Sequence, residues 1–269
     1  MRAPFWLARA FSIGLFAAVS LAARLAQAAD AETRPDAVPY RPTVSTPAAL
    51  SAPLWLEAEF GGLYLRNRPD DDPVRRSSVP YSLKLAFTED WGVRINGEAV
   101  ARATATDGTH ETGFGDTALI VKRRFAIDAS SAFGLEAGAA FPTARHGLST
   151  GSGKTDASVN GIYSADLGAW HTDLNLLNMR FGARQEGQSR LQTLGAASLS
   201  HPLDDRWTAA AELSGTRQRG ASGTAQVLGA LGWAVRRDVV LDIGVAHGLN
   251  RATPTWQAFM GATVVVGKL

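Results

Sequence analysis

The chain has 269 residues, no cysteine, 45% hydrophobic residues and a formal net charge of +2 from 27 basic and 25 acidic residues. The absence of cysteine excludes disulfides, thiolate metal sites and a thiol nucleophile. The small net charge gives no support to nucleic-acid binding, which needs a concentrated basic face.

The first 28 residues have the pattern of a secretory signal peptide. Arg2 and Arg9 precede the apolar run AFSIGLFAAVSLAA, and Ala26 and Ala28 occupy the small-residue positions of a cleavage site. Cleavage after Ala28 removes three of the 27 basic residues and no acid, so 24 basic residues remain against 25 acidic ones, a net charge of −1. The apolar run is short for a membrane-spanning helix, and a retained anchor helix is the alternative to cleavage.

Residues 29–52, ADAETRPDAVPYRPTVSTPAALSA, are rich in proline, alanine and threonine and lack apolar periodicity. This composition is typical of an extended or disordered segment. We interpret 29–52 as a periplasmic linker, and the alternative is a plug that enters a pore from below.

From residue 53 to the end, apolar and small or polar side chains alternate with period two, which is typical of β-strands. VPYSLKLAF, for example, places Tyr81, Leu83 and Leu85 on one face and Ser82 and Lys84 on the other. The pattern predicts strands over 54–65, 79–88, 91–101, 113–125, 132–142, 155–165, 169–181, 191–201, 206–217, 223–235, 239–248 and 255–266.

Short and long connections alternate strictly between these strands. Short turns are expected at 88–90, 127–132, 166–168, 203–205 and 236–238, and longer loops at 66–78, 102–112, 143–153, 182–190, 218–222 and 249–254. Outer-membrane barrels have short periplasmic turns and longer external loops, and a strand of about 9–11 residues crosses the bilayer at a tilt. The sequence therefore predicts an all-β fold, a closed antiparallel transmembrane β-barrel of about 12 strands over 53–269, in the outer membrane of a Gram-negative cell.

Aromatic residues gather beside the short turns, as expected for a girdle at the membrane–water interface. A soluble β-sandwich has no reason to place them there. The predicted girdle residues are Trp55, Phe87, Trp91, Phe125, Phe133, Trp170, Trp207 and Trp233.

Strand parity assigns most of the charged residues to the inner face, because the outer face of a barrel is apolar. If Phe125 faces Phe133 across its turn, the same register pairs Lys122 with Glu136 inside the barrel. The predicted lumen-lining residues are Glu57, Glu59, Lys84, Arg94, Glu98, Asp116, Lys122, Arg124, Glu136, Asp173, Glu212 and Asp242.

The stretch STGSGKTD, residues 149–156, has part of the pattern of a phosphate-binding loop. The full pattern needs a glycine at position 148, which is Leu148, and a helix after Gly153-Lys154-Thr155. The residues that follow alternate as a strand, so we interpret this stretch as an external loop.

ETGFGDTALIVKRRF, residues 111–125, resembles a block of a bacterial outer-membrane family of transporters linked to the meta-cleavage pathway of phenol degradation. GLEAGAAFPTA (134–144) and LGAWHTDLNL (167–176) look like later strands of that family. The resemblance implies an outer-membrane barrel with a channel or uptake role, often for aromatic or apolar compounds. Such barrels usually end in an aromatic residue that the barrel-assembly machinery recognises, whereas this chain ends in Leu269.

No catalytic, cofactor-binding or metal-binding residue is predicted. The chain has no Gly-x-Ser-x-Gly motif and no close His/Asp/Glu spacing for a metal. A lipid-modifying enzyme with a lipid-facing Ser–His pair stays an alternative, with candidates His110, His146, His171, His201 and His247. A closed structural or adhesive barrel is the other alternative to a channel.

The first functional hypothesis is therefore a porin-like channel that passes small molecules through the lumen. The inner charges then either form a network that rigidifies the wall or select the solute. Expected partners are outer-membrane lipid and lipopolysaccharide, the barrel-assembly machinery and a small-molecule solute, with no nucleic acid, and the protein is expected to be a monomer.

Overall fold

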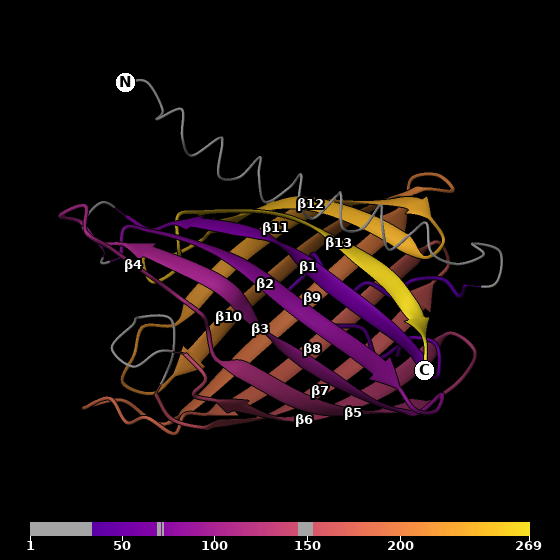
Figure 1. Ribbon diagram of the computed structural model, residues 1–269, viewed down its shortest axis with the longest axis horizontal. Coiled ribbons are helices and arrows are strands. Elements are labelled where there is room, and N and C mark those ends of the chain that lie inside the picture. The colour runs from indigo at the N-terminus through magenta and orange to yellow at the C-terminus, as the bar shows by residue number, and fades with distance from the viewer. Residues whose placement is uncertain (1–33, 69–70, 72, 145–152) are drawn as a thin grey trace.

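The computed structural model describes residues 34–68, 71, 73–144 and 153–269. They form one antiparallel sheet that closes on itself as a barrel (Figure 1). The predicted signal peptide and the predicted loop at 149–156 lie wholly or partly outside the described residues. None of the described residues forms a helix long and apolar enough to cross a membrane.

Alternating side chains form strands at nearly all the predicted positions. The strands are β1 (Trp55–Arg66), β2 (Arg75–Ala86), β3 (Trp91–Thr104), β4 (His110–Gly113), β5 (Thr117–Ala126), β6 (Ser131–Phe141), β7 (Asp156–Leu167), β8 (Trp170–Arg180), β9 (Leu191–Pro202), β10 (Trp207–Gln218), β11 (Thr224–Arg236), β12 (Val239–Gly248) and β13 (Trp256–Lys268).

The prediction of a single strand over 113–125 is wrong in one detail. β4 and β5 are two pieces of one barrel strand, because both pair with β3. β4 pairs with residues 101–104 of β3, and β5 pairs with residues 91–96. The ladder is interrupted at Phe114–Asp116, opposite the place where β3 carries a bulge against β2. A bulge disrupts the local ladder and bends the strand. Counting β4 and β5 as one, the barrel has 12 strands, and the predicted fold class is confirmed.

Around the ring each strand pairs with the next, with β4 and β5 together in one position beside β3, and β1 pairs with β13 to close the ring. Closure joins the first and last strands of the sheet, and a closed sheet is the form in which strands can span a lipid bilayer. The short turns and the C-terminus lie at one end of the barrel, and the longer loops lie at the other (Figure 1). We call these the turn end and the loop end.

The outer face is apolar and the inner face is polar. Large hydrophobic side chains such as Leu174, Leu176 and Leu213 are exposed on the outside, whereas many buried side chains are charged or carry hydroxyl and amide groups. This distribution is the reverse of a soluble protein and fits a barrel surrounded by hydrocarbon.

Candidate functional site: the lumen and the segment inside it

The inner wall brings six of the twelve predicted lumen-lining residues into two groups of buried or half-buried ion pairs. Lys84 of β2 forms ion pairs with Glu57 and with Glu59, the latter at 2.7 Å between Nζ and Oε1. On the neighbouring strands, Glu136 pairs with Lys122 at 3.6 Å and with Arg94 at 3.4 Å. The predicted register is confirmed, since Phe125 faces Phe133 and Lys122 faces Glu136. Buried charges are stable only when paired and hydrogen-bonded, and within each group the opposite charges meet this condition.

Other predicted wall residues lie outside these two groups. Glu98 pairs with Arg76 nearer the loop end, and Asp116 accepts a hydrogen bond from the Ala144 amide at 3.1 Å. Arg124 is partly exposed near the turn end. Three carboxylates on β8, β10 and β12 are also buried: Asp173, Glu212 and Asp242. The wall charges are therefore distributed over the whole circumference.

Residues 34–52 contact these walls from inside the barrel. Five of their backbone amides donate to wall oxygens on four strands: Val38 N to Glu57 (2.9 Å), Tyr40 N to Glu59 (2.6 Å), Ser45 N to Glu212 (2.7 Å), Thr46 N to Asn175 (3.1 Å) and Ala48 N to Ser164 (2.7 Å). Three further contacts run the other way, since wall side chains donate to carbonyls of the segment: Lys84 Nζ to Val38 at 2.5 Å, Asn175 Nδ2 to Thr46 at 2.9 Å and Lys122 Nζ to Pro47.

The segment enters and leaves at the turn end. At its start the Ala37 amide donates to the Arg237 carbonyl at 2.8 Å, and at its finish Pro53 bridges to Ala86 before β1 begins. Between these points it crosses from β1 and β2 to β10, β8 and β7 and returns. Because strands on opposite sides of the barrel are contacted, residues 34–52 cross the turn-end half of the lumen. We call these residues the lumenal segment.

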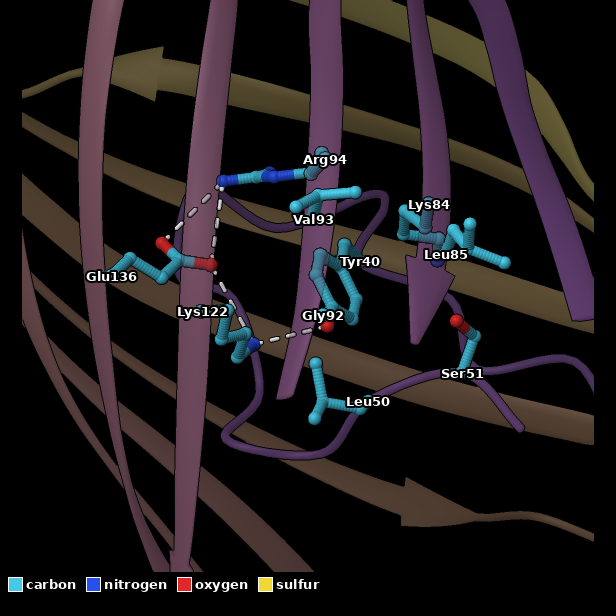
Figure 2. A pocket seen from close by; sticks show the side chains of 10 residues that line it. All are labelled: Tyr40, Leu50, Ser51, Lys84, Leu85, Gly92, Val93, Arg94, Lys122 and Glu136. Carbon is cyan, nitrogen blue, oxygen red and sulfur yellow. Dashed lines mark hydrogen bonds and ion pairs between the residues drawn. The ribbon is translucent and has the colours of Figure 1, made fainter. Parts of the chain in front are cut away.

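Tyr40 is the central side chain of the lumenal segment. Its ring is surrounded by three cations, with Lys84 Nζ 4.1 Å, Lys122 Nζ 4.3 Å and Arg94 Cζ 5.5 Å from the ring centroid. Its hydroxyl donates to the Ala49 carbonyl at 2.7 Å and accepts from Lys122 at 3.0 Å. Figure 2 shows the ring between these side chains, beside a small pocket that Leu50 and Ser51 also line. Cation–π attraction is strongest where the cations are desolvated, so Tyr40 ties the segment to three adjacent strands.

Two arginines anchor the first part of the lumenal segment to β12 and β13. Arg41 forms a forked pair with Asp242, with both N–O distances 3.1 Å, and Arg34 pairs with Asp238 at 3.4 Å and donates to the Val265 carbonyl at 2.7 Å. Burial alone would raise the pKa of the Asp238 carboxyl in its turn, but the hydrogen bonds and charge of Arg236, together with Arg34, lower that pKa below its usual value.

Glycine makes room for the Arg41 guanidinium. Gly61 and Gly261 face each other across β1 and β13. A Cβ atom added at Gly261 would lie 2.6 Å from Arg41 Nε, and one at Gly61 would lie 2.7 Å from Nη2. Side chains at these two positions would exclude the guanidinium, so the wall is shaped to accept Arg41.

We expect the Arg41→Met variant to speed hydrogen exchange at the Tyr40, Ser45 and Ala48 amides by about tenfold or more, because a charged hydrogen bond contributes about 1.5–3 kcal/mol. The matched control is Arg237→Met, which removes the exposed pair with Asp36. Exposed pairs contribute little, so the control should leave exchange unchanged. Equal exchange in all three proteins, measured by mass spectrometry, would show that Arg41 does not anchor the segment.

The structure shows no hydrolase arrangement among the described histidines. His171 lies between Asp166 (2.6 Å) and Asp173 (3.2 Å), His201 packs on Trp170, and His247 packs on Trp256. In the described part of the chain, no serine hydroxyl is hydrogen-bonded to a histidine ring, and no three His, Asp or Glu side chains are grouped to hold a metal. His146 lies outside that part.

The predicted girdle residues lie near the turn end. Six of them are exposed on the outer surface, and Trp233 stacks on exposed Trp207 with a centroid distance of 5.6 Å. Trp55 is half-buried. Arg123, which has outward parity, lies over the rings of Trp91 and Phe125 at 5.0 and 4.5 Å. Aromatic and cationic side chains at this height suit a membrane interface. The exposed members are Phe87, Trp91, Phe125, Phe133, Trp170 and Trp207.

A closed 12-stranded barrel with an apolar exterior and a polar lumen defines an outer-membrane β-barrel protein. Residues 90–265 match the family model described as "Putative MetA-pathway of phenol degradation". The match covers more than half of the chain, and the chain belongs to this family, as the resemblance in the sequence implied. Among curated proteins, no sequence matches this chain.

Solved structures with the same fold include three outer-membrane channels and porins. The COG4313 outer membrane channel from Pseudomonas putida F1 is 11% identical, with a TM-score of 0.64 over 81% of this chain and 97% of that one. The NanC porin is 9% identical, with a TM-score of 0.56 over 78% of this chain and 98% of the porin chain. The KdgM porin in complex with oligogalacturonate is 8% identical, with a TM-score of 0.53 over 77% of this chain and 98% of the porin chain. At these identities the likeness is one of fold.

Proposed function

We propose that this protein is an outer-membrane channel for small molecules, exported by a signal peptide over residues 1–28 and not an enzyme. The observation that carries the proposal is that a chain segment separate from the wall crosses the turn-end half of the lumen. The segment is held to the wall by side chains and backbone hydrogen bonds without a covalent cross-link. Its departure opens a path and leaves the barrel strands in place.

The size of the barrel supports a narrow pore. Side chains fill an eight-stranded barrel, and about 16–18 strands leave a wide aqueous channel, so 12 strands leave an intermediate space. The family description and the channels and porins of the same fold agree with this role. Because the family is described by phenol degradation, aromatic compounds are the first solutes to test.

The experiment is single-channel recording in planar bilayers of residues 29–269 beside a truncation to residues 53–269. We expect discrete conductance steps, larger or more frequent for the truncation, because the lumenal segment is then absent. Both proteins are checked as folded barrels by heat-modifiable migration on gels. Silence from both folded proteins would overturn the channel proposal and favour a closed structural barrel or a lipid-modifying enzyme.

A further inference from the structure

A group of exposed arginines lies at the loop end of β8, β9 and β10. The β8–β9 loop and the β10–β11 loop meet there, since the Ser189 amide donates to the Arg219 carbonyl at 2.8 Å and the Gln218 side chain donates to the Ser189 carbonyl at 2.8 Å. The Phe181 amide donates to the Arg190 carbonyl at 2.8 Å, which closes the first loop. We call the five residues of this group the rim arginines: Arg180, Arg184, Arg190, Arg217 and Arg219.

The rim arginines have no carboxylate partner among the described residues. Glu186 is the single acid in the two loops. The turn end is different, because Arg236 there pairs with Asp238 and Arg237 pairs with Asp36. The five positive charges on these strand ends and loops repel one another, and a protein that keeps them exposed gains stability from an anionic ligand.

Two of the rim arginines continue the lipid-facing rows of their strands. On β8, Leu174 and Leu176 are exposed on the outer face, and Arg180 follows Leu176 on that face four residues later. On β10, Leu213 is 58% exposed and Arg217 follows four residues later. Four residues of strand span about 13 Å. The arginines therefore lie above the apolar band on its outer surface, at the height of the lipid headgroups.

We infer that the rim arginines bind the phosphate groups of outer-leaflet lipid, which in a Gram-negative outer membrane is lipopolysaccharide. Guanidinium groups form forked hydrogen bonds to phosphate oxygens, and these bonds are shorter and stronger than neutral ones. A free phosphate ion offers the same chemistry. The continuation of the apolar rows into Arg180 and Arg217 favours a ligand with both acyl chains and phosphate. This inference does not depend on whether the lumen conducts.

The test measures lipid binding to the purified barrel by native mass spectrometry. The probes are lipid A carrying both phosphates, the same lipid A without phosphates, and inorganic phosphate. We expect the wild-type protein to bind phosphorylated lipid A at least tenfold more tightly than the dephosphorylated form, and Arg180→Gln/Arg217→Gln to lose about tenfold or more of that affinity.

The matched control is Arg206→Gln/Lys268→Gln, which removes two exposed cations from the turn end. The control should bind phosphorylated lipid A as the wild type does. Equal binding of both lipid A forms, or an equal loss of affinity in the control variant, would overturn the inference. So would inorganic phosphate that binds as tightly as phosphorylated lipid A and displaces it fully, because that result would indicate a free-anion site. Heat-modifiable migration verifies that each variant is folded.

Discussion

A disulfide in the Ala48→Cys/Gly134→Cys variant is expected to hold the pore shut, and its reduction is expected to reopen it. An ideal Cβ atom at Gly134 lies 3.4 Å from the Ala48 Cβ atom, close to the Cβ–Cβ separation of about 3.5–4.5 Å in disulfides. The chain has no other cysteine, so the bond forms between these two positions alone. It ties the lumenal segment to β6 and prevents its departure.

The measurement is single-channel recording before and after a reductant is added. We expect the oxidised variant to lose at least nine-tenths of the wild-type open time, an effect of about tenfold or more that corresponds to at least 1.4 kcal/mol, and the reduced variant to recover it. The single variants Ala48→Cys and Gly134→Cys are the controls, and a reductant should not change them. Wild-type conductance in the oxidised double variant would show that the current does not pass the lumenal segment.

The second large effect is expected from Lys84→Met, which should lower the free energy of unfolding by about 3–5 kcal/mol. Lys84 is 3% exposed and is the cation that pairs with both Glu57 and Glu59. Without it, two buried carboxylates lose their counter-charge, and the Val38 carbonyl and the Tyr40 ring lose a contact. Reversible unfolding in urea, followed by tryptophan fluorescence in detergent or lipid vesicles, measures the change.

Two variants separate charge from packing. Lys268→Met removes an exposed lysine and should change the free energy by less than about 0.5 kcal/mol. Lys84→Met/Glu57→Gln/Glu59→Gln removes the whole charged group and should recover much of the loss, because neutral amides need no buried cation. If Lys84→Met were as stable as the wild type, the ion pairs with Glu57 and Glu59 would not stabilise the barrel.

The fold could be predicted from local patterns because a barrel repeats one simple rule. Every strand alternates between lipid and lumen, and the chain returns through short turns on one side and longer loops on the other. Period two therefore located the strands, and parity with the turn geometry of Phe125 and Phe133 was sufficient for the Lys122–Glu136 register. The interruption of the strand at Phe114–Asp116 was not predicted, because it lies opposite a bulge in a neighbouring strand that the local pattern does not show.

The sequence predicted the wall of the candidate site but not the segment inside it. The charged wall residues were predicted from strand parity, because the apolar face of each strand is the one that contacts lipid. Tyr40 and Arg41 were not assigned a role, since a segment without periodicity carries no signal for what it contacts. The proline-rich composition of 29–52 favours a linker, whereas the structure places residues 34–52 against the inner wall.

The sequence by itself thus determined the class of fold and the closed barrel, and it predicted the charged wall residues. Only the tertiary structure decided where residues 34–52 lie and which wall groups meet them. The physical reason is the separation along the chain: Ser45 bonds Glu212 and Arg41 pairs with Asp242, partners 167 and 201 residues away. Such contacts exist only after the barrel has closed and brought those strands around one lumen.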